Sequence, residues 1–111
     1  MEYNELTPEE RLLLVGLLEM VVAADQTLSQ QEDSELKRIA AQVGEEAFKA
    51  AIEVADERFK GAEEIRQLAL SIQRVEAREL IFTAIQEVAV SDEVTIEEMQ
   101  LVNWLADLWD L

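Results

Sequence analysis

The feature that most constrains this chain is a stretch that occurs twice, once near each end. Residues 21–32 read Val-Val-Ala-Ala-Asp-Gln-Thr-Leu-Ser-Gln-Gln-Glu, and residues 88–98 read Val-Ala-Val-Ser-Asp-Glu-Val-Thr-Ile-Glu-Glu. In both, an apolar run stops at an aspartate, and a Ser or Thr then stands three residues before a Glu. That last spacing is typical of a capping box, in which the hydroxyl and the carboxylate satisfy N–H groups of the first helical turn. We therefore expect a helix, an acidic turn and a second helix, twice over.

The similarity of the two copies extends beyond the turns. At a spacing of 67 residues Leu14 and Val21 coincide with Ile81 and Val88, and past the turn the spacing falls to 66. Such a repeat predicts one supersecondary unit used twice, with pseudo-twofold packing that places both acidic turns in related positions. We place the halves at residues 7–44 and 74–111 of one domain that spans residues 1–111.

Apolar residues at helical spacing predict an all-α bundle of about six helices. The first helix is apolar almost all round, so we expect it to be central and buried. Its Gly16 either marks the close approach of another helix backbone or is merely tolerated, and the last helix is expected to turn Met99 inward. Trp104 and Trp109 lie on that helix, where we expect one or both in the core. The predicted helices run from residue 8 to the first acidic turn and over residues 29–43, 45–59, 63–73, 76–90 and 95–111.

Composition narrows the chemistry that this chain can perform. There is no cysteine and no histidine, which excludes disulfides, thiolate chemistry, imidazole bases and the usual ligands of structural zinc. Carboxylates are abundant, yet no nucleophile or phosphate-binding loop accompanies them. We therefore predict a protein that is not an enzyme.

The net charge of −16 is concentrated at the two ends of the chain. Residues 1–36 hold nine acids and one base, residues 37–78 hold eight of each, and residues 79–111 hold eight acids and no base. Such a field repels nucleic acid and anionic lipid, attracts cations or a basic partner, and opposes self-association at low salt. The apolar region 12–24 is interrupted by Glu19 and is too short to span a bilayer. We expect a cytoplasmic protein without membrane insertion.

Residues 23–32, Ala-Ala-Asp-Gln-Thr-Leu-Ser-Gln-Gln-Glu, resemble the signature of the TerB-like family, the tellurite-resistance protein B group. The turn of that family reads roughly Ala-Asp-Gly-x-aliphatic-Ser-x-x-Glu and typically occurs twice. The resemblance covers nearly the whole chain and implies a compact all-α domain with two similar halves, acidic turns associated with divalent metal, and a link to tellurite resistance, stress responses and membrane-associated complexes. This chain departs from the pattern because Gln26 and Glu93 replace the Gly, and because its second turn is one residue shorter.

Two explanations of the acidic turns are open. An aspartate at the negative end of a helix requires compensation, and the carboxylates could accept backbone N–H bonds within their own turns. Alternatively a cation bridges them, and since all donors are oxygens, Ca²⁺ is expected first and Mg²⁺ next. The candidate ligands of such a cation are Asp25, Glu32, Asp92, Glu93 and Glu98.

Two functions follow from these observations. The first is a non-catalytic, acidic binding or sensing domain of the TerB-like kind, in stress response, that holds a divalent cation at the paired turns. The second is an acidic interaction module with no metal, which scaffolds or blocks a basic partner as immunity proteins and nucleic-acid mimics do. A response to calcium separates the first from the second, whose binding would instead fall steeply with salt.

Overall fold

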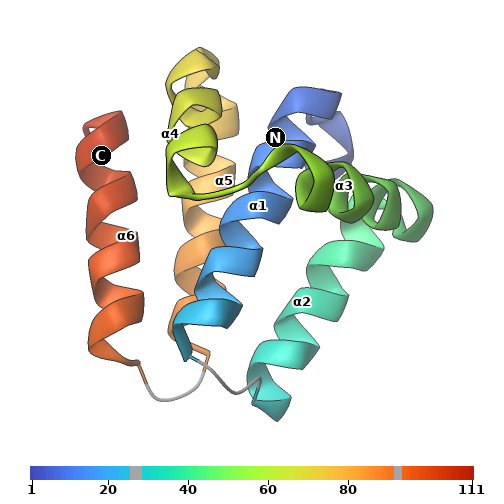
Figure 1. The fold of residues 1–111 in the computed structure, drawn as a ribbon. Coiled ribbons are helices and arrows are strands. Elements are labelled where there is room, and N and C mark those ends of the chain that lie inside the picture. The colour runs from blue at the N-terminus through green and yellow to red at the C-terminus, as the bar shows by residue number, and fades with distance from the viewer. Residues whose placement is uncertain (26–28, 92–93) are drawn as a thin grey trace.

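The computed structural model describes residues 1–25, 29–91 and 94–111, and within these ranges the chain forms six α-helices, a short 3₁₀ helix and no strand. The prediction of an all-α bundle of about six helices is therefore confirmed. The elements, shown in Figure 1, are η1 (Tyr3–Glu5), α1 (Pro8–Asp25), α2 (Gln30–Val43), α3 (Glu45–Arg58), α4 (Ala62–Ser71), α5 (Val75–Ala89) and α6 (Ile96–Trp109).

Helices α1 and α5 form the centre of the bundle. α1 packs against α3, α4, α5 and α6, while α5 also packs against α2 and α6, so that α2 and α6 flank the central pair (Figure 1). Leu13, Leu14 and Leu17 of α1 and Ile81 and Ile85 of α5 are fully buried. The prediction of a buried first helix is confirmed, because a helix that is apolar almost all round must be covered on most of its faces.

The start of α1 is tied to the start of α5. Thr7 N donates to Glu10 Oε1 at 2.8 Å and Glu10 N donates to Thr7 Oγ1 at 3.2 Å, which completes a capping box. The same carboxylate accepts from Arg74 Nε at 2.9 Å, and Arg74 also donates to the carbonyl of Glu5 at 3.2 Å. Glu10 is buried, so these charge-assisted bonds compensate its desolvation, and the Arg74 guanidinium lowers the pKa of Glu10 below its ordinary value.

Gly16 lies against a side chain rather than against a helix backbone. A Cβ at this position would stand 2.7 Å from Cε2 of the Phe59 ring, closer than carbon atoms can approach. Phe59 directly follows α3, where that helix crosses α1. The close neighbour of Gly16 is therefore the ring of Phe59 and not the backbone of another helix.

The inward face of α6 differs from the predicted one by part of a turn. Met99 is 47% exposed, whereas Leu101, Val102 and Leu105 are buried, because α6 packs against α5 and α1 together. The inward prediction for Met99 is therefore wrong. Trp109 is 4% exposed, and its Nε1 donates to the carbonyl of Ala69 at 2.9 Å, so the expectation of a core tryptophan is confirmed.

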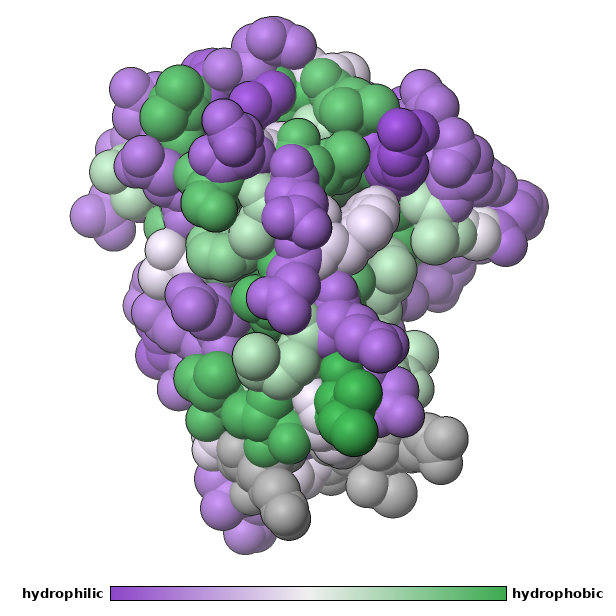
Figure 2. Space-filling model, turned by 90° about the vertical axis from the view of Figure 1, so that its left-hand side faces the viewer, coloured by the Kyte–Doolittle hydropathy of each residue, from purple (hydrophilic) through white to green (hydrophobic). Residues whose placement is uncertain are grey.

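One side of the bundle carries apolar groups at its surface. Val94, Ile96 and Met99 are exposed at and before the start of α6, and Figure 2 shows apolar side chains gathered in the lower part of this side. The same view shows the outline hollowed below its upper lobe, on the side that faces the viewer in Figure 1. Within the described ranges, no helix has both the length and the apolar character that crossing a membrane requires.

Candidate functional site

The helix ends next to the two acidic turns lie at one end of the molecule. α1 and α5 end there, and α2 and α6 begin there, as Figure 1 shows at the bottom of the view. α1 ends at Asp25, as the sequence predicts, and α5 ends at Ala89. The topology therefore brings the flanks of both turns to a common acidic end, although their sequences lie far apart.

Glu32 and Glu98 are buried in matching capping boxes at this end. Glu32 N donates to Ser29 Oγ at 3.1 Å and Ser29 N donates to Glu32 Oε1 at 3.4 Å. Glu98 N donates to Thr95 Oγ1, and Thr95 N donates to Glu98 Oε1, both at 3.1 Å. Each carboxylate is 1% exposed. Both glutamates thus have the capping role that the sequence predicts, and their first carboxylate oxygens are engaged by the backbone.

The second oxygen of Glu98 bears on the predicted cation. Among the described residues, Oε2 of Glu98 is buried and has no hydrogen-bond partner. A buried carboxylate oxygen requires a donor or a cation, so this atom fits the ligand set that was predicted for Ca²⁺. The side chain of Asp25, and Asp92 and Glu93 entirely, lie outside the described residues. No group of three or more acidic side chains suited to a metal is found in the part of the chain that the structure describes, and the five-residue site stays a prediction.

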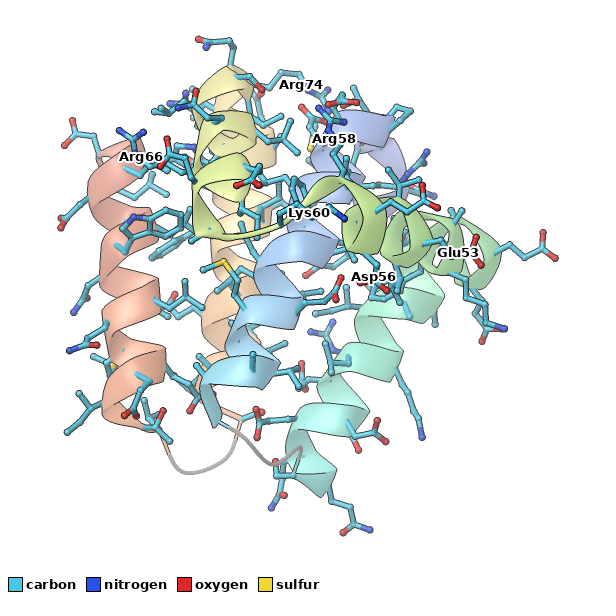
Figure 3. The ribbon with its side chains drawn as sticks, viewed as in Figure 1. Glu53, Asp56, Arg58, Lys60, Arg66 and Arg74 are labelled. Carbon is cyan, nitrogen blue, oxygen red and sulfur yellow. The ribbon has the colours of Figure 1, made fainter. Side chains whose placement is uncertain are left out.

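Basic side chains gather away from the acidic end. Arg58, Lys60, Arg66 and Arg74 all lie in the upper half of the molecule in Figure 3, on α3, α4 and the segments beside them. Toward the other end, Arg38 of α2 bridges its own helix to α5 by contacts with two glutamates. These four bases therefore lie in the half of the molecule away from the helix ends that flank both turns.

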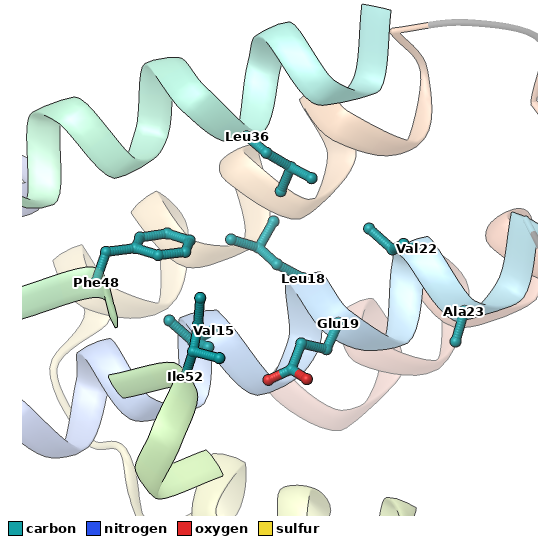
Figure 4. Close-up of a pocket in the computed structure, with 8 residues that line it drawn as sticks. All are labelled: Val15, Leu18, Glu19, Val22, Ala23, Leu36, Phe48 and Ile52. Carbon is teal, nitrogen blue, oxygen red and sulfur yellow. The ribbon is translucent and has the colours of Figure 1, made fainter. Parts of the chain in front are cut away.

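A groove opens where α1 and α2 diverge below α3. Its volume is about 300 Å³, and in the described part of the chain all its lining residues are apolar apart from a single carboxylate. Figure 4 shows the side chains of α2 and α3 converging on α1 across this space. We call it the α1 groove; its lining residues are Val15, Leu18, Glu19, Val22 and Ala23 of α1, Leu36 of α2, and Phe48 and Ile52 of α3.

The one carboxylate of the α1 groove belongs to a pair. Glu19 of α1 makes a hydrogen-bonding contact with the carboxyl group of Asp56 on α3. Desolvation by the surrounding side chains and, second, the contact with Asp56 together raise the pKa of Glu19 to about 7. Both carboxylates also border a second hollow with Lys60, which makes no ion pair with either of them in the described part of the chain. With a pKa of about 7, Glu19 is about half protonated near neutral pH.

Sequence reasoning did not identify the Glu19–Asp56 pair. The available signal was Glu19 itself, a charge in the middle of the most apolar run of the chain. A charge in such a run indicates a gap in the surrounding helices or a polar partner, but no local pattern shows that the partner is Asp56 of another helix.

The comparisons add no relative to these observations. The chain matches no model of a protein family, no curated protein and no solved structure.

Proposed function

We propose that this chain is a non-catalytic, acidic binding domain of the TerB-like kind that senses a divalent cation at its two turns, in a stress response. The observation that carries this proposal is the buried Oε2 of Glu98, which has no hydrogen-bond partner among the described residues. It lies at the start of α6, at the end of the molecule where both acidic turns are flanked by helix termini. A hard cation bound there would compensate carboxylates that burial otherwise disfavours.

Calcium is the ion that this donor set favours. The ligands proposed are Asp25, Glu32, Asp92, Glu93 and Glu98, and all of them supply oxygen. Ca²⁺ accepts six to eight oxygens in flexible geometry, whereas Mg²⁺ requires nearly octahedral geometry and retains water. The capping box engages Oε1 of Glu98 and leaves its Oε2 for the ion, so most of the coordination would come from the turns and from water.

Thermal unfolding with calcium and with EDTA tests the proposal. Calcium at one hundred times its Kd raises the free energy of unfolding by about 2.7 kcal/mol, which is a shift in Tm of roughly 10 °C for a domain of this size. The shift is expected to disappear in Asp25→Asn and Asp92→Asn and to persist in Glu46→Gln, which removes an exposed charge at the start of α3. An unchanged Tm of the wild-type protein at 5 mM calcium would eliminate the cation site.

The second candidate is an acidic interaction module for a basic partner, with no metal. It is favoured by α6 and the end of α5, which contain no basic residue, and by the apolar α1 groove. Binding of this kind would persist in EDTA and weaken steeply between 50 and 300 mM salt, because exposed charges are screened over about 10 Å or less.

A further inference from the structure

We propose that the α1 groove is the docking site of a basic amphipathic helix of a partner protein, whose apolar side chains enter the groove and whose Lys or Arg lies against Glu19 and Asp56. This inference deepens the second candidate function. It rests on the groove and its carboxyl pair and does not depend on a cation at the acidic turns.

The lining of the groove indicates an apolar occupant. Val15 and Leu18 form a buried floor, whereas Val22, Leu36 and Phe48 are only half-buried. Partly exposed apolar side chains that converge from three helices are typical of recognition surfaces rather than of finished cores. A partner that covers them gains the free energy of burying apolar area.

In the second copy of the repeated unit, the positions that correspond to the groove residues are covered by helix packing. At a spacing of 67 residues Val22 corresponds to Ala89, and at 66 residues Leu36 corresponds to Val102. Ala89 and Val102 are buried, because α5 and α6 pack directly against each other. In the first copy α1 and α2 diverge, and their equivalent side chains line the groove instead. The groove is thus the place where the first unit lacks a helix contact that the second unit has.

The length of the groove fits a helix. The face of α1 that lines the groove runs from Val15 to Ala23 and is about 12 Å long, at a rise of 1.5 Å per residue. On a docked helix, side chains at i and i+7 are about 10.5 Å apart, so anchors at i, i+3 or i+4 and i+7 match this length.

Charge decides which kind of helix the groove would bind. Glu19 and Asp56 place two acidic groups in contact at its edge, and a cation beside them favours the ionised form of both. Among the residues that the structure describes, Lys60 is the one base that borders the adjoining hollow, and the net charge of the chain is −16. A basic helix therefore complements both the edge of the groove and the field of the whole molecule, whereas an acidic helix would be repelled.

The test uses a fluorescein-labelled 14-residue peptide of Leu and Lys, with Leu at i, i+3, i+4 and i+7. Fluorescence anisotropy measures its Kd in 150 mM NaCl and EDTA, where the cation proposal plays no part. Ala23→Trp, which fills the groove at an exposed position, should raise Kd by about tenfold or more, and Glu19→Gln by about threefold to tenfold. The matched controls Ala41→Trp on α2 and Glu79→Gln on α5, both exposed and outside the groove, should stay within about twofold of wild type.

Two outcomes would overturn the assignment. If Glu19→Gln and Glu79→Gln raise the Kd of the peptide equally and Ala23→Trp leaves it unchanged, the peptide binds only through net charge. If sedimentation finds a dimer of the wild-type protein and a monomer of Ala23→Trp, a second copy of the chain covers the groove. Circular dichroism verifies folding of each variant, and Glu19→Gln is expected to be at least as stable as wild type, so the test does not depend on the tryptophan variant alone.

Discussion

Glu19→Gln is expected to stabilise the protein at alkaline pH and to leave it nearly unchanged at acidic pH. The pKa of Glu19 is about 7 in the folded chain, against an ordinary value of 4.5. The folded state therefore holds a proton that the unfolded state releases, and stability falls as the pH rises from 4.5 through 7. The glutamine removes this effect, and its amide can donate to the Asp56 carboxylate as a protonated Glu19 does.

The magnitude follows from the same pKa. Taken at face value, the difference between 4.5 and about 7 corresponds to about 3 kcal/mol of destabilisation above pH 7. Glu19 is exposed, however, and water screens its repulsion with Asp56, so we expect about 1 kcal/mol. This corresponds to a rise in Tm of about 4 °C at pH 8, of which about half remains at pH 5 and almost none at about pH 3.

Urea denaturation at pH 5, 6.5 and 8, followed by circular dichroism at 222 nm, measures the difference in unfolding free energy between variant and wild type. Glu79→Gln is the control, because it removes one charge from an exposed position of α5 away from the pair. A stabilisation by Glu19→Gln that does not change with pH, or that Glu79→Gln reproduces, would refute the raised pKa of Glu19 beside Asp56.

Three further substitutions probe the packing described above. Glu10→Gln should cost about 1–3 kcal/mol at pH 7. Because the hydrogen bonds from Arg74 and Thr7 hold the pKa of Glu10 below its ordinary value of 4.5, the difference from wild type should shrink as the pH falls below 4.5 in urea titrations. Gly16→Ala should stabilise by about 1 kcal/mol only when combined with Phe59→Ala; a similar gain with the ring present would contradict the 2.7 Å clash. Trp109→Phe should cost about 1–2 kcal/mol through loss of the bond to Ala69 O, and an unchanged denaturation midpoint would argue against that bond.

The candidate site was partly accessible to sequence reasoning. The spacing of Ser29 and Thr95 to Glu32 and Glu98 predicted both capping boxes, because such a box involves groups only three residues apart. The coordination of a cation by the two turns remains a prediction, since Asp92, Glu93 and the side chain of Asp25 lie outside the described residues. The α1 groove was not predicted, because it depends on how α2 and α3 are placed against α1. That placement is set by contacts between residues far apart in the chain.

By itself the sequence determined the local structure and the central helix. The helical period of the apolar residues and the Ser/Thr-x-x-Glu spacings indicate where helices lie and where two of them begin, and the apolar character of α1 requires it to be buried. Only the tertiary structure decided which groups meet across helices. The Phe59 ring over Gly16 and the contact of Glu19 with its partner on α3 arise because α3 crosses α1 at one particular register, and a helical repeat specifies a face of a helix but not the residue that packs against it.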